Sequence, residues 1–174
     1  MIGRLTLAVT DMHLDTERDY LKPDEAMKLL HASKEHYLGA GIWLAILSGL
    51  RTEAIRALRW QSVDFDKGQI LIREAFKEKE ARVEEYPKGK KWEYVPMPPA
   101  LADFLRERRR DSKSTYVAPG MNGGLLNYKI WLYGVRRLCK EASVPVVSPH
   151  ELRQLLHRAL CRAGGIARGS QAPP

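Results

Sequence analysis

His150 and Arg153 are the residues whose types and spacing most directly suggest chemistry. They lie three positions apart in SPHELR, where Ser148, Pro149 and Glu151 have the order of a helix N-cap, a first-turn proline and a capping-box acid. Side chains at this spacing project from one face of a helix, beside backbone N–H groups that have no partner within it. Such a helix start attracts phosphate, and a guanidinium and an imidazole add charge-assisted hydrogen bonds. The pattern predicts an oxyanion site; the competing interpretation is an incidental histidine beside a solvated arginine.

Two other basic segments could complete a phosphate site. Arg51 follows the glycine break in SGLRTEAIRALRW, and PKGKK places Lys88, Lys90 and Lys91 in a glycine turn between two short extended runs. Phosphoryl transfer mainly needs fixed positive groups around the phosphate oxygens, because its transition state is highly negative. The zinc-peptidase motif would need a second histidine at position 154, which is Gln154. We therefore expect no metal and no small-molecule cofactor.

These segments resemble the signatures of the tyrosine recombinase, or phage integrase, family. SGLRTEAIRALRWQSVDFD resembles the first signature, in which a buried helix ends and presents an arginine to the scissile phosphate. PKGKKWEYVP resembles the family's β-hairpin, and PHELR its second signature of histidine, two residues and arginine. The order and the intervals match, and the resemblance covers roughly residues 20–165.

The resemblance implies a catalytic set of four residues: Arg51, Lys88, His150 and Arg153. In this family the two arginines hold the non-bridging oxygens of the phosphate, the histidine assists, and the hairpin lysine protonates the leaving 5′ oxygen. Lys90 and Lys91 are alternatives for that lysine and are expected to contact DNA.

The sequence also departs from the family pattern. Ala54 stands where the family usually has an acid that braces the site, and Gln154 stands where it usually has a histidine. Residues 154–174 contain no tyrosine, whereas the family's nucleophilic tyrosine follows the second signature. Because covalent catalysis cannot begin without a nucleophile, we expect a C-terminally truncated domain that is inactive alone. Three tyrosines that precede the second signature are expected to be core or surface aromatics: Tyr116, Tyr128 and Tyr133.

The elements that must position these residues are mainly helical. Apolar periodicity and caps predict helices over about residues 23–37, 39–49, 52–60, 99–110, 125–142 and 148–163. Alternating runs predict strands over 69–76, 80–86 and 92–97, which we expect to form one small antiparallel sheet. The fold class is thus α+β, mainly helical, a tyrosine-recombinase catalytic-domain-like helical bundle with a small antiparallel β-sheet. The predicted division is a linker or arm remnant over 1–19, the catalytic domain over 20–165 and an irregular tail over 166–174.

Other features have structural interpretations. The four tryptophans are expected to pack in the core or beside the sheet: Trp43, Trp60, Trp92 and Trp131. The arginine-rich run RERRR at the end of a helix is expected to be a solvated face, with contact to a phosphate as the alternative. Cys139 and Cys161 are expected to be buried free thiols.

Charge and hydropathy narrow the class of partner. The net charge of +8 favours a polyanion, and a hydrophobic content of 44% suits a folded domain. No segment is apolar for long enough to predict a membrane span, so we expect a cytoplasmic protein without membrane contact. Double-stranded DNA is the expected partner, with other recombinase protomers as a second.

The sequence therefore predicts the DNA-binding catalytic domain of a site-specific tyrosine recombinase, of a phage or another mobile element. Its reaction would be DNA integration or recombination by phosphotransesterification. The alternative is a non-catalytic DNA-binding or regulatory module derived from an integrase. A relative of the type IB topoisomerases is a third hypothesis, which the compact hairpin and the short spacing between the signatures disfavour.

Overall fold

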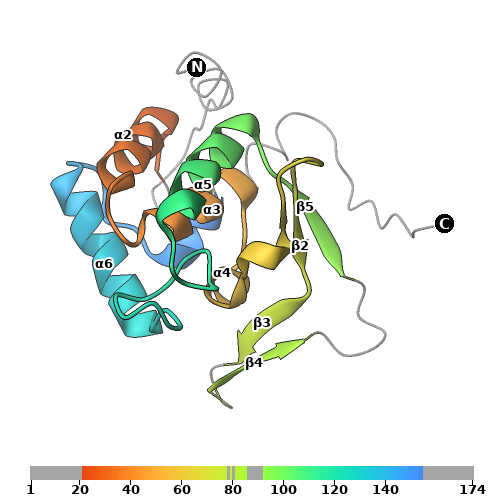
Figure 1. Ribbon diagram of the computed structural model, residues 1–174. Coiled ribbons are helices and arrows are strands. Elements are labelled where there is room, and N and C mark those ends of the chain that lie inside the picture. The colour runs from red at the N-terminus through yellow and green to blue at the C-terminus, as the bar shows by residue number, and fades with distance from the viewer. Residues whose placement is uncertain (1–20, 78, 80, 86–91, 155–174) are drawn as a thin grey trace.

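The computed structural model describes residues 21–77, 79, 81–85 and 92–154. The helices gather on one side of the molecule and the strands extend on the other (Figure 1). The helical elements are α2 (Pro23–Ser33), α3 (Gly39–Ser48), α4 (Thr52–Ala57), the 3-10 helix η1 (Trp60–Ser62), α5 (Pro99–Asp111) and α6 (Tyr128–Glu141). The strands are β1 (Val63–Asp64), β2 (Gln69–Ile72), β3 (Glu74–Lys77), β4 (Arg82–Glu85) and β5 (Glu93–Pro96). Residues 149–154 form a further helical segment. The predicted α+β, mainly helical class is confirmed, while the predicted outer segments 1–19 and 166–174 lie outside the described residues.

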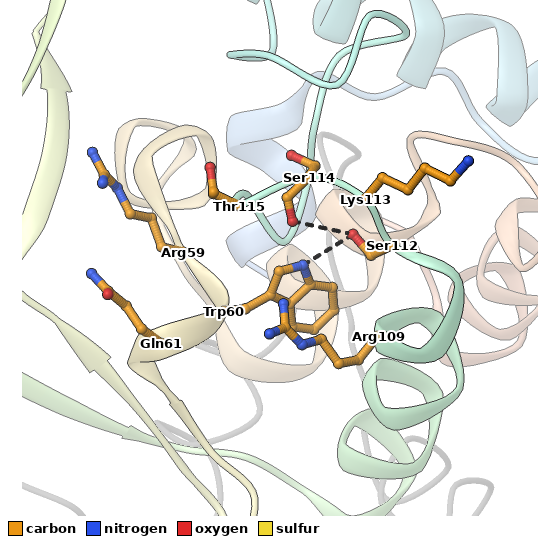
Figure 2. Close-up of a pocket in the computed structure, with 8 residues that line it drawn as sticks. All are labelled: Arg59, Trp60, Gln61, Arg109, Ser112, Lys113, Ser114 and Thr115. Atoms are coloured by element: carbon orange, nitrogen blue, oxygen red, sulfur yellow. Dashed lines mark hydrogen bonds between the residues drawn. The ribbon is translucent and has the colours of Figure 1, made fainter.

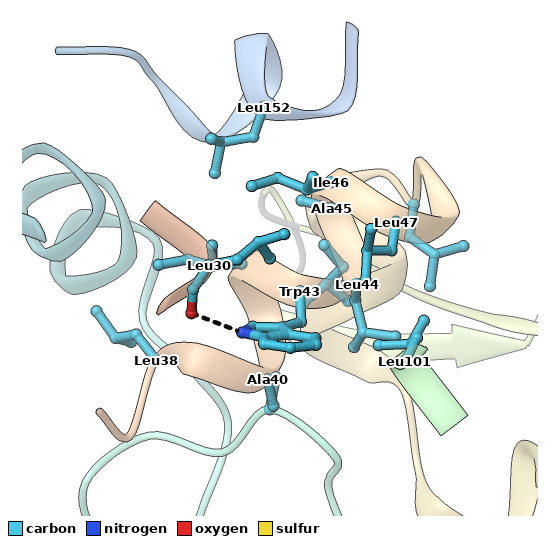
Figure 3. Packing of buried hydrophobic residues seen from close by; sticks show 14 of the residues in the cluster. Leu30, Leu38, Ala40, Trp43, Leu44, Ala45, Ile46, Leu47, Leu101 and Leu152 are labelled. Atoms are coloured by element: carbon cyan, nitrogen blue, oxygen red, sulfur yellow. Dashed lines mark hydrogen bonds between the residues drawn. The ribbon is translucent and has the colours of Figure 1, made fainter. Parts of the chain in front are cut away.

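Helix α3 lies at the centre of the core. All ten of its residues are buried, as its almost uninterrupted apolar sequence predicts. The indole of Trp43 in α3 donates a hydrogen bond to the carbonyl oxygen of Leu30 at 3.1 Å (Figure 3). The same ring stacks on Phe104, with 4.1 Å between the ring centroids. Trp43 therefore ties α3 to both α2 and α5. The helix ends at Gly49, whose φ of 62° is the left-handed conformation that favours glycine at a C-cap.

Helix α6 approaches α3 at a glycine. The indole of Trp131 is fully buried, and a Cβ added at Gly41 would lie only 2.8 Å from its ring. The absence of a side chain at Gly41 thus makes room for a fully buried tryptophan. Helix α6 begins at Tyr128, later than predicted, because the side chain of Asn127 accepts hydrogen bonds from the backbone N–H groups of Lys129 and Ile130.

The strands form two sheets, so the prediction of one sheet was wrong. Strands β1, β2 and β5 are antiparallel in that order, while β3 and β4 pair separately, with Phe76 opposite Val83. The strand predicted over 69–76 is broken at Arg73. Ile70 and Ile72 are both buried at a period of two, but Ala75 and Phe76 are buried although adjacent. Beyond the break, β3 pairs with β4 and packs against α4, with both of these neighbouring side chains buried.

Several smaller expectations were also wrong. The helix predicted over 52–60 ends at Ala57, because Leu58 is extended with ψ of 123°. The first helix ends at Ser33, and Arg108 of α5 donates hydrogen bonds to the carbonyl oxygens of Lys34 and His36 just beyond it. Arg108 therefore closes a helix end and is not part of a solvated face.

Of the tryptophans, Trp92 alone departs from the prediction. Its side chain is 54% exposed, whereas Trp43, Trp60 and Trp131 are buried as expected. Cys139 is a buried free thiol, and burial raises its pKa, so the thiol stays neutral. Cys161 lies outside the described residues.

Candidate functional site

Arg51 emerges at the surface where the central helix ends. The left-handed turn at Gly49 reverses the chain after α3, and Arg51 then takes extended backbone angles (φ −70°, ψ 150°) as the N-cap of α4. Its carbonyl oxygen accepts the first hydrogen bond of that helix, from Ile55 N–H at 2.9 Å, while its side chain is exposed. A deeply buried helix therefore holds the backbone of a solvent-facing cation.

The second candidate arginine is held at the same turn. The guanidinium Nε of Arg153, which is half-buried, donates a hydrogen bond to the carbonyl oxygen of Gly49 at 2.8 Å. Gly49 is only two residues before Arg51 and 104 residues before Arg153 in the chain. The fold thus brings the two signature segments together.

The helical start that carries His150 and Arg153 is built as predicted. The backbone N–H of Ser148 donates to the carboxylate of Glu151, and Glu151 N–H donates to Ser148 Oγ at 3.4 Å, which completes the capping box. Leu152 is fully buried in the core and fixes the rotation of this segment. His150, by contrast, is exposed. The three predicted residues with described positions therefore lie on two adjoining segments; Lys88, Lys90 and Lys91 lie outside the described residues.

A buried arginine, for which no role was predicted from the sequence, joins the elements around Arg51. Arg56 is only 4% exposed; its Nε donates to the carbonyl oxygen of Leu126 at 2.6 Å, and its guanidinium carbon lies 3.9 Å from the centroid of the Phe76 ring. Because Arg56 is on the same short helix as Arg51, it connects that helix to β3 and to the start of α6. The one signal in the sequence is that Arg56 lies between the apolar residues Ile55 and Ala57.

Replacing Arg56 with methionine is expected to lower the free energy of unfolding by about 2–3 kcal/mol. The substitution keeps most of the apolar stem but removes a hydrogen bond from a charged donor, worth about 1.5–3 kcal/mol, and a contact of a cation with an aromatic ring. Urea unfolding followed by circular dichroism measures the loss. Arg110→Met is the matched control, because Arg110 is exposed and its replacement should change the stability by less than about 0.5 kcal/mol. Equal stabilities of the two variants would contradict the structural role of Arg56.

The departures from the family pattern have different surroundings. Ala54, at the position where the family usually has an acid, is buried with 5% of its surface exposed, so α4 presents a methyl group there. Gln154 is half-buried.

Across the described part of the chain, no group of three histidine, cysteine or acidic side chains is placed to hold a metal ion. Within the same residues, no helix has both the length and the apolar content to cross a membrane.

Comparison with known proteins decides the family. Residues 19–169 match the model of the phage integrase family. The chain belongs to this family. This integrase-family chain is 29% identical over 159 residues to tyrosine recombinase XerC of Xanthomonas axonopodis pv. citri, covering 87% of the chain and 48% of the relative. It is 25% identical over 177 residues to a XerC-like tyrosine recombinase of Caldanaerobacter subterraneus subsp. tengcongensis, covering 87% and 45%. The chain thus spans about half the length of the curated relatives it matches.

Solved structures show the same fold for this integrase-family domain. The XerA recombinase superposes with a TM-score of 0.70 at 20% identity, covering 89% of this chain and 53% of the other. The Tn1549 transposon integrase gives 0.73 at 16% identity, with 86% and 56% covered. The catalytic core of lambda integrase gives 0.62 at 16% identity, and the match covers 84% of this chain and 85% of the core. The family and the fold predicted from the signatures are therefore confirmed.

Proposed function

We propose that this chain binds double-stranded DNA as the catalytic domain of a site-specific tyrosine recombinase, gripping a backbone phosphate between Arg51, His150 and Arg153. The observation that carries the proposal is the hydrogen bond from Arg153 to Gly49, because it brings the second signature to the turn that presents the first. Guanidinium forks suit phosphate oxygens, and the exposed imidazole of His150 adds a hydrogen-bonding group on the same helical segment as Arg153. The net charge of +8 supports a polyanionic partner.

The proposed chemistry is a phosphoryl transfer without a metal. Arg51 and Arg153 would hold the non-bridging oxygens and stabilise the charge that develops on them, with His150 assisting. A tyrosine hydroxyl attacks phosphorus in this family and releases its proton to solvent, the bond from phosphorus to the 5′ oxygen breaks, and Lys88 would supply the proton that this oxygen takes up. Residues 154–174 contain no tyrosine, so we propose that these 174 residues bind DNA but do not cleave it alone.

The relatives suggest the partners and the location. The Tn1549 integrase was solved in complex with circular intermediate DNA, and lambda integrase as a tetramer bound to a Holliday junction. We extend to this chain both a duplex DNA partner and other recombinase protomers. A protein acting on DNA in this way would work in the cytoplasm of its bacterial or phage-infected host.

Binding to duplex DNA is expected to weaken steeply as salt is raised. Each phosphate contact releases condensed counterions, so log Kd should rise by about 0.9 per tenfold increase in salt for each contact. Fluorescence anisotropy with a labelled duplex at several sodium chloride concentrations measures the slope. A slope near zero would contradict binding through phosphate contacts.

A nicked suicide duplex is expected to trap no covalent adduct with these 174 residues. Among the tyrosines before the second signature, Tyr128 and Tyr133 lie on α6, and Tyr116 packs beside Arg59. Denaturing gel electrophoresis after incubation with the labelled duplex provides the measurement. An adduct that disappears when one of these tyrosines is replaced with phenylalanine would show that an upstream hydroxyl can act as the nucleophile.

A non-catalytic DNA-binding or regulatory module is the second candidate function. The buried methyl group of Ala54, at the position where the family usually has a bracing acid, favours it. This candidate predicts that the chain inhibits an intact recombinase by occupying its DNA sites. Titrating the chain into a recombination assay with an intact recombinase tests for this inhibition. A variant that carries Ala54→Glu and a C-terminal tyrosine segment separates the two functions. It should recombine DNA if the chain is a recombinase domain, and it should only inhibit if the chain is a regulatory module.

A further inference from the structure

A surface hollow of about 510 Å³ lies between η1 and the end of α5 (Figure 2). Residues 59–61 line one side, and Arg109 with residues 112–115 lines the other. None of these residues belongs to the candidate phosphate clamp of Arg51, His150 and Arg153. The hollow is therefore built from a separate set of side chains, and its volume lies within the range of small-ligand sites.

The wall of the hollow is fixed by hydrogen bonds. The indole Nε1 of Trp60 donates to Ser112 Oγ at 3.2 Å, and the backbone N–H of Trp60 donates to the carbonyl oxygen of Thr115 at 3.1 Å. Ser114 Oγ donates to the carbonyl oxygen of Gly123 at 2.7 Å and accepts from Tyr116 N–H at 3.0 Å. Two segments about fifty residues apart in the chain are thus joined before any ligand arrives, which lowers the entropic cost of binding.

The hollow carries positive charge that the described protein leaves uncompensated. The guanidinium of Arg109 lies 5.2 Å from the ring centroid of Trp60, and in Figure 2 it points toward the side from which Gln61 projects. Arg59 is offset by Glu74 at 3.2 Å, but neither Arg109 nor Lys113 has an ion pair with any described residue. No carboxylate lines the hollow. Cations gathered at a concave surface attract an anion more strongly than isolated ones do.

We propose that this hollow is a second phosphate-binding site. Arg109 offers a planar fork of N–H donors to phosphate oxygens, and the exposed Gln61 and Thr115 on the two sides add uncharged hydrogen-bond donors. Lys113, which extends from the rim on a flexible stem, adds a mobile positive charge. The phosphate can be a phosphodiester of DNA or a free phosphate group, since both present the same oxygens to these donors.

The first arm of the test uses inorganic phosphate and the whole chain. Phosphate added at constant ionic strength is expected to shift the Trp60 indole N–H resonance in a saturable way, because this group is bonded to a residue that lines the hollow. The double variant R109Q/K113Q should weaken that binding at least about tenfold. The matched control R110Q/K28Q removes the same charge from exposed positions outside the hollow and should bind phosphate as the parent does. An unmoved Trp60 resonance, or equal weakening in both variants, would overturn the proposal.

The second arm identifies the source of the phosphate. If the site takes DNA, a duplex will shift the same resonance, and R109Q/K113Q will lower the salt slope of duplex binding by about 0.9 for each DNA phosphate that the variant no longer binds. If duplex leaves the resonance in place while inorganic phosphate still moves it, the ligand is a free phosphate group. The first arm uses no DNA and changes no residue of the phosphate clamp, so failure of the clamp and failure of this site are distinguishable.

Discussion

Replacing Arg51 with alanine is expected to weaken binding to duplex DNA by about 10- to 100-fold. A hydrogen bond to a charged group is worth about 1.5–3 kcal/mol, and each 1.4 kcal/mol is a tenfold change in Kd. The variant should fold normally, because the side chain is exposed and makes no hydrogen bond that caps α4. Fluorescence anisotropy at one fixed salt concentration gives the change in Kd, and the salt slope should fall by about 0.9.

Arg110→Ala is the matched control for this prediction. Arg110 is also an exposed arginine, on α5, and its removal changes the net charge by the same amount. General electrostatic attraction predicts equal losses of affinity from the two variants, whereas a phosphate held at the turn after Gly49 predicts a much larger loss from Arg51→Ala. Equal affinities of the two variants for duplex DNA would therefore contradict the phosphate clamp and would indicate general attraction to a basic surface.

Replacing Trp131 with alanine is expected to lower the free energy of unfolding by about 3–5 kcal/mol. The indole is fully buried against Gly41 of the central helix, and removing a large aromatic group from a packed core leaves a cavity as well as losing burial. Urea unfolding monitored by circular dichroism measures the difference. A loss this large is a substantial part of the stability of most domains, so the variant should also show a clearly lower Tm.

Two further variants test whether that loss of stability comes from the buried packing of the Trp131 ring. Tyr133→Ala, on the same helix but 65% exposed, should change the stability by less than about 0.5 kcal/mol. Trp131→Phe should retain much of the stability, because it keeps an aromatic ring and removes an indole N–H that has no hydrogen-bond partner among the described residues. A Trp131→Ala variant as stable as Tyr133→Ala would show that the packing against Gly41 is not part of the stabilising core.

The sequence predicted the parts of the fold that depend on local signals. Periodicity and capping located α3 and its end at Gly49, and the Ser148 and Glu151 pair marked the start of the last helical segment. The break at Arg73 could not be predicted in the same way. Alternation describes one strand at a time, whereas the break depends on β3 packing against α4 instead of continuing beside β5.

The candidate site likewise has parts that local sequence signals predict and parts that they do not. The spacing of His150 and Arg153 predicted one face of a helix, and the resemblance to the integrases supplied Arg51, but no local pattern predicts the hydrogen bond that Arg153 makes to Gly49. Arg56 shows the limit most clearly. A charged residue in a short helix is normally expected at the surface, and its burial depends on a carbonyl group 70 residues away.

The hydrogen bond between Arg153 and Gly49 can form only late in the synthesis of the chain. The two residues are 104 positions apart, and ribosomes add about 5–20 residues per second, so Arg51 exists for about 5–20 s before Arg153 is synthesised. During that interval a growing chain carries one arginine of the pair without the other. The contact that brings the two signature segments together can therefore form only after most of the chain has been synthesised.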